Sequence, residues 1–138
     1  MESMHGVMHL YRAHRMRALR SASHELAPME GKALGFFARH PGATLSELAA
    51  HSGRDKGQLA RLIAGLRERG LLEAVPDAAD RRTVRLQPTA DGQAMHQALR
   101  RHGRRIAAIA TAQLSADERQ QLLALMAKIR AALEAAEA

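Results

Sequence analysis

The sequence contains no cysteine and no tryptophan among its 138 residues, and only one tyrosine and two phenylalanines. Without cysteine the chain forms no disulfide and has no thiolate for catalysis or redox sensing, so any metal site would have to use histidine and carboxylate ligands. Aromatic residues make up 2% of the chain and apolar residues 46%, so the core has to be aliphatic and rich in alanine. Such a composition favours helices, because Ala, Leu, Arg, Glu and Gln lose little side-chain entropy there.

Long apolar runs are also missing. None approaches the roughly 20 residues that a membrane-spanning helix needs, and the N-terminus has no hydrophobic signal-peptide core. We therefore expect a soluble, cytoplasmic protein with no membrane partner. A chain of this length has room for one compact domain, with helical extensions that pack against a partner.

Positive charge, by contrast, is abundant. Lys and Arg number 21 against 14 Asp and Glu, which gives a formal net charge of +7. Most of the positive residues are arginine, whose planar guanidinium suits phosphate oxygens and guanine edges. A polyanion is the first partner to consider, although charge alone does not separate DNA from RNA or an acidic membrane.

Two helices are predicted in the first 40 residues. Apolar residues recur at helical spacing over residues 3–23, as in an amphipathic helix. A second helix is expected to begin at Pro28, because the first turn of a helix tolerates the missing N–H of proline. It should stop before Pro41-Gly42, which is a strong turn signal.

A pair of short helices on a tight turn is predicted next. Thr44 and Glu47 have the spacing of a capping box, in which the two side chains satisfy each other's backbone donors at a helix start. Ser52-Gly53 supplies the turn, and Asp55 can cap the next helix, which is expected to run to Arg69. This arrangement is typical of a helix-turn-helix.

From Leu71 the apolar period changes from that of a helix to that of a strand. Residues 71–75 and 83–87 are expected to form two strands on either side of a polar loop. Alternation in the second strand predicts that Val84 and Leu86 point to the core. The sequence therefore predicts a β-hairpin directly after the helix-turn-helix.

Two long helices are predicted at the C-terminus. Thr89 is expected to cap the first, and Ser115 with Glu118 forms a second capping box that opens the last helix. Apolar residues recur in both helices at heptad spacing, which indicates a partner along their length. The heptad positions are Met95, Leu99, His102, Ile106 and Ile109, then Leu122, Met126, Ile129 and Leu133.

The exposed side of the helix after Asp55, together with the hairpin tip, carries the candidate DNA-contacting residues. Gln58 has the donors and acceptors to bind adenine in the major groove, and Arg61 those to bind guanine. Arg81 at the hairpin tip has the reach for the narrower minor groove. A solvated surface would explain each feature alone, but helix, hairpin and basic tip in succession indicate DNA binding. The full set is Arg54, Lys56, Gly57, Gln58, Arg61, Arg81 and Arg82.

Two acids lie in the same hairpin loop. Asp77 and Asp80 would repel DNA phosphates, so they make sense only if they orient the arginines or fix the loop.

Taken together, residues from about Pro28 to Arg130 resemble the MarR family of winged-helix transcription regulators. The resemblance lies in residues 40–49, 61–63 and 66–72, and most specifically in the wing pattern of residues 77–82 followed by residues 86–92. It implies a mainly α fold with a small β-hairpin wing. It also implies a DNA-binding lobe over residues 28–88, and a homodimer held by helices in residues 1–27 and 89–138.

The resemblance further implies a mode of action. In the family, two recognition helices enter successive major grooves of a pseudo-palindrome, and the wings enter the flanking minor grooves. Many members are repressors that leave DNA when a small anionic or aromatic effector binds between the dimer region and the DNA-binding lobe. The family layout would place these residues around that cleft: Met8, Tyr11, Arg15, Ala33, Phe36 and Phe37.

The chain departs from the family on its reading surface. At Gly57, Gln58 and Ala60 it lacks the hydroxyl side chains that the family often has there. The loss of these hydroxyls predicts an altered operator preference, and Gly57 also makes the first turn of the helix less rigid.

The alternative is a winged-helix module that binds protein or RNA and no operator. An enzyme is not expected, because no Gly-rich phosphate loop, cysteine nucleophile or paired-carboxylate arrangement appears, and no Ser-His-Asp triad is identifiable from spacing. We expect no catalytic residues.

Histidines and arginines outside these motifs have simple explanations. His5 and His9 would share one helix face at a spacing that can chelate zinc, but no third and fourth ligand follows, so neither metal nor cofactor is expected. A basic cluster without a nearby acid fits a solvated surface, and contact with DNA backbone or an anionic effector stays open. Its members are Arg100, Arg101, Arg104 and Arg105.

Overall fold

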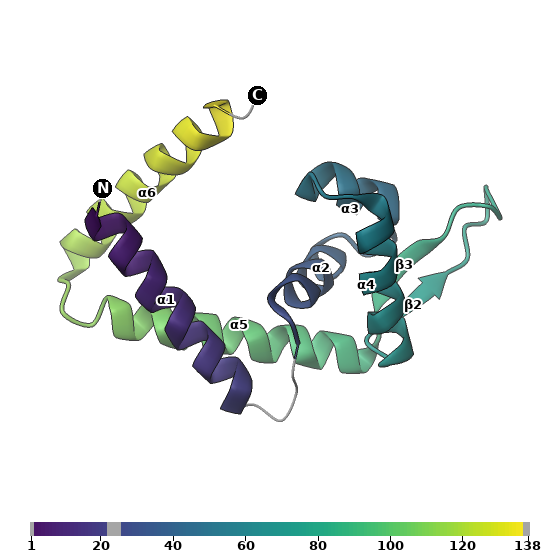
Figure 1. Cartoon of the computed structure of the whole chain (residues 1–138), viewed down its shortest axis with the longest axis horizontal. Helices are drawn as coiled ribbons and strands as arrows, with labels where there is room; N and C mark the ends of the chain where they lie inside the picture. Colours follow the sequence, from purple (N-terminus) through teal and green to yellow (C-terminus); the bar gives the residue numbers. More distant parts are fainter. Residues whose placement is uncertain (1, 22–25, 137–138) are drawn as a thin grey trace. The chain divides into compact units, whose positions relative to one another are not determined.

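A computed structural model describes residues 2–21 and 26–136, without the side chains of residues 18–21. The chain divides into two compact units, Met1–Gly103 and Arg104–Ala138. Its elements (Figure 1) are α1 (Glu2–Ser21), α2 (Pro28–Arg39), β1 (Ala43–Thr44), α3 (Leu45–Ser52), α4 (Lys56–Glu68), β2 (Leu72–Val75), β3 (Arg85–Pro88), α5 (Ala90–Ala110) and α6 (Ala116–Ala136).

The predicted helix starts are confirmed by their capping bonds. At the start of α3, the Thr44 N–H donates to the Glu47 carboxylate over 2.7 Å, and the Glu47 N–H donates to the Thr44 hydroxyl over 3.2 Å. At the start of α4, Asp55 Oδ1 accepts from the Gln58 N–H at 3.0 Å. The predicted box of Ser115 and Glu118 opens α6 in the same way. These bonds satisfy backbone donors that a helix start otherwise leaves unpaired.

The observed ends of the helices also lie close to the predicted ones. α2 starts at Pro28 and stops at Arg39, as predicted. α4 ends at Glu68, one residue before the expected Arg69, and the Gly70 that follows has a φ of +70°. This left-handed conformation suits glycine, which has no Cβ to clash. The predicted first helix ends at Ser21 in the structure, and the last two residues predicted for it, 22 and 23, lie outside the described residues.

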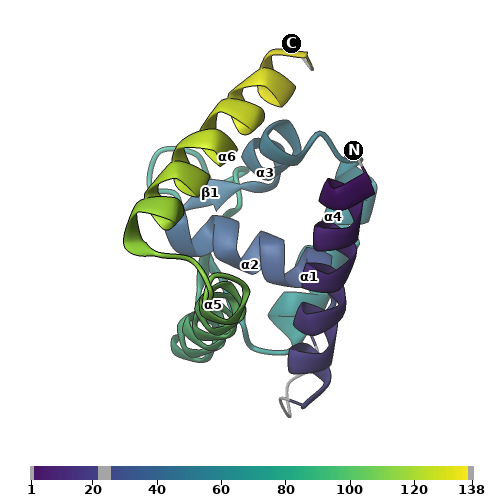
Figure 2. The same ribbon diagram turned by 90° about the vertical axis from the view of Figure 1, so that its left-hand side faces the viewer.

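The sheet has three strands instead of the predicted two. β2 and β3 form the expected antiparallel hairpin, and β1 pairs antiparallel with the other edge of β3, with Ala43 opposite Leu86. Figure 2 shows β1 leading directly into α3. A strand of two residues is too short to give a periodic signal, so the sequence did not reveal it.

The prediction that Val84 points to the core is wrong. Val84 is 54% exposed, whereas Leu86 two residues later is 2% exposed. The cause is the position of the strand: β3 begins at Arg85, where its pairing with Val75 of β2 also ends. Val84 therefore precedes the paired part of the hairpin and has no core beneath it.

The core of the first unit lies among α2, α3, α4 and the sheet. Its largest fully buried side chains are Leu34, Phe37, Leu59 and Leu66, and each stabilises the fold by about 1.5–3 kcal/mol through removal of apolar surface from water. Leu59 and Leu66, with Ile63 between them, form the buried face of α4. The core thus fixes the orientation of α4 and leaves its other face to solvent.

The predicted heptad positions differ widely in exposure. Met95 and Leu99 pack against the core of the first unit, and Ile106 is buried, but Ile109 is 60% exposed. In α6, no described residue is buried, and the four predicted heptad positions are all exposed. The described part of the chain has no helix with the combined length and apolar character needed to cross a membrane.

Candidate nucleic-acid interface

The solvent face of α4 carries the residues predicted to contact DNA. Lys56, Gln58 and Arg61 are exposed, and Arg61 lies opposite the buried face of the helix. Arg54 is also exposed and immediately precedes the capping residue. The structure therefore brings four polar side chains together at the start of one helix.

Gly57 leaves space for the Asp55 carboxylate that caps this helix. A Cβ at position 57 would lie 3.0 Å from Asp55 Oδ1, the oxygen that caps the helix. That contact is closer than most van der Waals contacts, so a larger residue would press against the cap. Glycine at this position keeps the capping bond undisturbed, at the cost of some helix rigidity.

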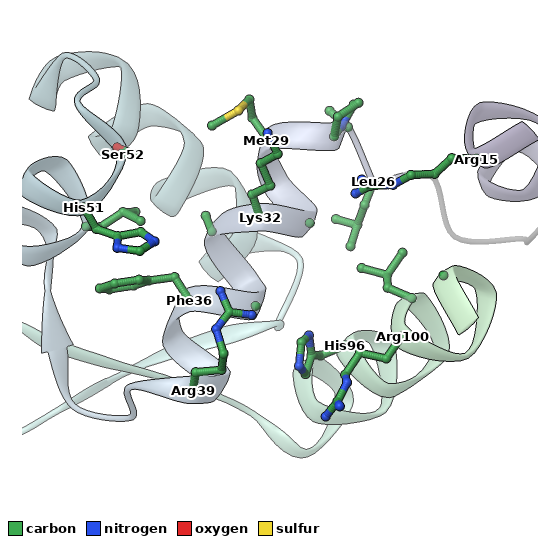
Figure 3. Close-up of a pocket in the computed structure, with 18 of the residues that line it drawn as sticks. Arg15, Leu26, Met29, Lys32, Phe36, Arg39, His51, Ser52, His96 and Arg100 are labelled. Carbon is green, nitrogen blue, oxygen red and sulfur yellow. The ribbon is translucent and has the colours of Figure 1, made fainter. Parts of the chain in front are cut away.

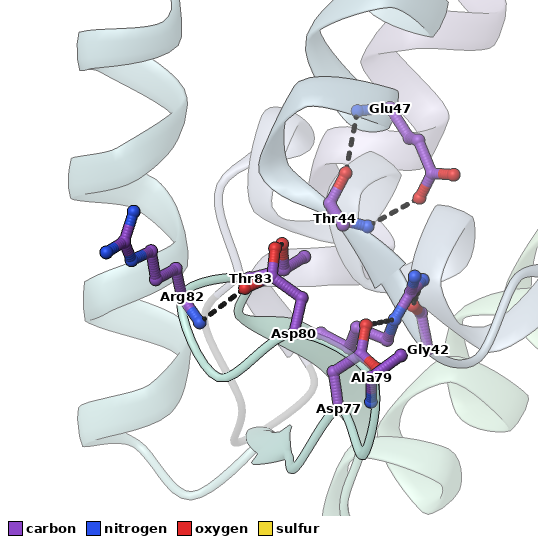
Figure 4. A network of polar contacts seen from close by, with 9 residues as sticks. Gly42, Thr44, Glu47, Asp77, Ala79, Asp80, Arg82 and Thr83 are labelled. Atoms are coloured by element: carbon purple, nitrogen blue, oxygen red, sulfur yellow. Dashed lines mark hydrogen bonds and ion pairs between the residues drawn. The ribbon is translucent and has the colours of Figure 1, made fainter.

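The second acid of the wing fixes its loop. Asp80 accepts hydrogen bonds from the Thr83 hydroxyl at 2.7 Å and from the Arg82 N–H at 2.9 Å (Figure 4). The Thr83 hydroxyl, followed by the Arg82 N–H, lowers the pKa of Asp80 because both bonds favour the ionised carboxylate. The Asp80 carboxylate thus holds the turn that presents Arg81 and Arg82 to solvent.

The first acid holds the base of the wing. Asp77 accepts from the Arg85 Nε–H at 2.7 Å and from the Ala79 N–H at 2.9 Å, and Arg85 also donates to the Gly42 carbonyl oxygen at 3.1 Å. The hydrogen bond from Arg85, then that from Ala79, lowers the pKa of Asp77. Arg85 therefore ties the wing to the turn before β1.

The two acids do not pair with the tip arginines. Within the described residues, the side chains of Arg81 and Arg82 form no ion pair, and both residues are exposed. Instead, Asp77 bonds to the Arg85 side chain, and Asp80 bonds to the Thr83 hydroxyl and to the backbone of the loop. Sequence reasoning missed the role of Arg85, whose outward position in the second strand was the available signal.

We predict that Asp77→Asn loosens the wing. The neutral amide loses the charge that attracts Arg85, and because Arg85 is 42% exposed the effect is moderate: trypsin should cleave after Arg81 and Arg82 about fivefold faster. The lowered pKa means that this stabilisation is fully present above the ordinary value of 3.8 and is lost only as pH falls below it. Digestion at pH 7–8 with mass-spectrometric identification of the cut sites measures the full difference. Glu68→Gln, at the exposed end of α4, is the control. An equal increase in the cleavage rate of that variant would contradict a role of the Asp77–Arg85 ion pair in holding the wing.

A cavity of about 590 Å³ lies beside α2, within the first unit (Figure 3). Four of the six residues expected around an effector line it, and they are Tyr11, Arg15, Ala33 and Phe36. The structure places Met8 outside the lining and Phe37 in the core, fully buried. The sequence did not point to several basic or polar lining residues, namely Lys32, Arg39, His51, Ser52 and His96.

In the described part of the chain, no three His, Asp or Glu side chains are grouped closely enough to hold a metal ion. His5 and His9 both lie on α1, and neither belongs to such a group.

Comparisons with known proteins agree with this geometry. A profile of the MarR family matches residues 24–83. YybA of Bacillus subtilis (strain 168), described as an uncharacterized HTH-type transcriptional regulator, is 27% identical over 95 residues, which are 69% of this chain and 63% of that protein. The match thus spans less than two thirds of the length of this relative.

Solved structures share the fold over almost the whole chain. A crystal structure of MarR is 29% identical, covering 96% of this chain and 90% of that chain with a TM-score of 0.75. FabT of Streptococcus pneumoniae, solved in complex with DNA, is 18% identical, covering 96% and 94% with a TM-score of 0.84. The chain is therefore similar to the MarR family, through the profile match over residues 24–83 and through the fold that it shares with the solved MarR structure.

Proposed function

We propose that this protein is a homodimeric, sequence-specific DNA-binding repressor of transcription that a small-molecule effector releases from a pseudo-palindromic operator. The observation that carries the proposal is the charge arrangement of the helix and wing. Lys56 and Arg61 on α4, and Arg81 and Arg82 at the wing tip, are exposed, while the nearby acids Asp77 and Asp80 are engaged within the wing and Asp55 in the helix cap. Free cations and occupied carboxylates are what a phosphate backbone requires.

Dimerisation accounts for the exposed apolar side chains of the terminal helices. Val7 and Leu10 of α1 are more than 60% exposed, as are Leu123 and Leu133 of α6. Side chains of this size at helical spacing lose their contact with water when a second copy covers them. Size-exclusion chromatography with light scattering at micromolar concentration is the direct measurement, and a monomer would contradict this part of the proposal.

The binding experiment uses fluorescence anisotropy with DNA from the intergenic region upstream of the protein's own gene. We expect affinity for one site to exceed affinity for scrambled DNA by about 10³-fold or more, and to fall steeply as salt rises. A winged-helix module for protein or RNA is the rival. Equal affinity for the intergenic and the scrambled DNA, or no binding to either, would favour that rival and contradict the proposed repressor function.

Arg81→Ala tests the wing. We expect weaker operator binding, by about tenfold, and a flatter preference for A·T over G·C pairs in the flanking minor groove, because an arginine there reads groove width and potential. The variant should remain a folded dimer by circular dichroism and light scattering. Unchanged affinity and unchanged flank preference would refute the assignment of Arg81 to the minor groove.

A further inference from the structure

The cavity beside α2 has an unusual charge balance. Its lining includes five cationic side chains, and no described lining residue is an Asp or Glu. Within the described part of the chain, none of the five forms an ion pair. The chain as a whole has 14 acids, so their exclusion from this lining leaves a concentrated positive potential. The five cations are Arg15, Lys32, Arg39, Arg54 and Arg100.

Three basic groups in the cavity are close neighbours. Figure 3 shows His96 between Arg39, from α2, and Arg100, from α5. A Cβ built on Gly35 would lie 3.2 Å from Arg39 Nη1 and 3.4 Å from His96 Cε1, so the guanidinium and the imidazole reach the same spot on α2. Glycine at position 35 provides the room for both.

Their proximity leaves a positive charge without a counter-charge. Burial, followed by the charges of Arg100 and Arg39, lowers the pKa of His96. Like charges at this distance repel, and the repulsion is relieved when an anion binds between them. Two arginine forks offer several parallel N–H donors to one oxyanion, and the imidazole adds another.

The rest of the cavity is suited to an apolar body. Leu26, Leu48, Phe36 and Leu99 contribute carbon surface to its lining. On the wall away from His96, the Ser52 hydroxyl is buried and has no hydrogen-bond partner within the described residues (Figure 3). A buried hydroxyl without a partner is costly, so a ligand atom that pairs with it would be favoured. The volume falls within the range of sites for small organic molecules.

We propose that this cavity binds a small organic dianion whose two negative charges share one head group, which Arg39, His96 and Arg100 hold, with an apolar body extending toward Ser52. The inference rests on the proposed function, because such a ligand would be the effector of the repressor. A phosphate monoester and a dicarboxylate share this chemistry. A monoanionic or neutral aromatic compound would leave one or both arginines without a counter-charge.

Isothermal titration calorimetry on the full-length dimer tests the charge requirement with matched probes. Phenyl phosphate and phthalate supply the two sources of a double charge, benzoate supplies one charge on a similar body, and benzyl alcohol supplies none. We expect at least one of the two dianions to bind about tenfold or more tightly than benzoate, and benzyl alcohol to bind most weakly. Benzoate binding as tightly as both dianions, or the absence of binding by both, would overturn the proposal.

Variants locate the head group. Arg39→Gln and Arg100→Gln should each weaken binding of the preferred dianion about tenfold while affecting benzoate less. Arg101→Gln is the matched control, because Arg101 is the next residue on α5, is exposed and does not line the cavity. An equal loss in Arg101→Gln would show that bulk charge alone is responsible and would overturn the site.

The same proteins separate this inference from the proposed function. Operator affinity is measured by anisotropy in the absence of any probe, for the wild type and each variant. A wild-type protein that binds the operator normally but shows no preference for a dianion over benzoate overturns only the cavity assignment. Dianion binding without operator binding overturns only the repressor.

Discussion

Replacing Arg61 with alanine is expected to lower operator affinity by about 10- to 100-fold. Arg61 is exposed on the solvent face of α4, one turn after Gln58, while Leu59 and Ile63 anchor the opposite face in the core. A guanidinium in this position can make two hydrogen bonds to a guanine edge, and loss of such a pair costs roughly 1–3 kcal/mol. Fluorescence anisotropy with the operator, and with a duplex in which each candidate guanine is replaced, gives both affinity and specificity.

Arg67→Ala is the control for this experiment. Arg67 is also exposed and lies on the same helix, but six residues later, which is about 240° around the helix axis from Arg61. Both variants remove one positive charge from α4, so they share any general electrostatic effect. If the two lose affinity equally and neither changes base preference, Arg61 contacts phosphate or solvent instead of a base.

Local signals were the part of the fold that the sequence predicted well. The caps at Thr44, Asp55 and Ser115 depend on residues three positions apart, and the structure contains each of the expected bonds. Gly70 ends α4 for an equally local reason, since its left-handed backbone favours glycine. Such features need no knowledge of the tertiary structure, so pattern and propensity are sufficient.

The sequence did not predict the contacts between segments that are far apart in the chain. Arg85 reaches the Gly42 carbonyl across 43 positions, and the ion pair of Arg69 with Glu30 spans 39. The charge of the cavity also depends on contacts between distant segments, because its lining comes from five helices and the turns between them. The periodicity of the sequence does not show which side chains come into contact when helices pack. It does not predict the two-residue strand β1 either, because β1 is defined by its pairing with β3.

The predicted site residues divide into those with hydrogen bonds inside the wing and those that are exposed. Asp77 and Asp80 have defined bonds in the wing, whereas the side chains of Gln58 and Arg61 are exposed. A single chain shows how the wing is held, because those contacts are internal.

Gly92→Ala is expected to destabilise the fold by about 3 kcal/mol, which lowers the melting temperature by roughly 10 °C. A Cβ at position 92 would lie 2.0 Å from the Leu71 carbonyl oxygen and 3.2 Å from Pro88 Cβ. The neighbour is backbone, and the Leu71 oxygen also accepts the Thr89 N–H at 3.1 Å, so the first turn of α5 would have to move away from the sheet. That movement would expose Leu71, which is buried.

Gly103→Ala separates this clash from the general effect of the substitution. Gly103 is on the same helix, and a Cβ there meets nothing within 4 Å. Alanine at that position should stabilise the protein by up to about 1 kcal/mol, because glycine loses more backbone entropy in a helix. Both melting curves are recorded at one protein concentration, since the proposed dimerisation would make the midpoint depend on concentration. A Gly92→Ala protein as stable as the Gly103→Ala protein would show that α5 is not held against Leu71 as closely as the structure has it.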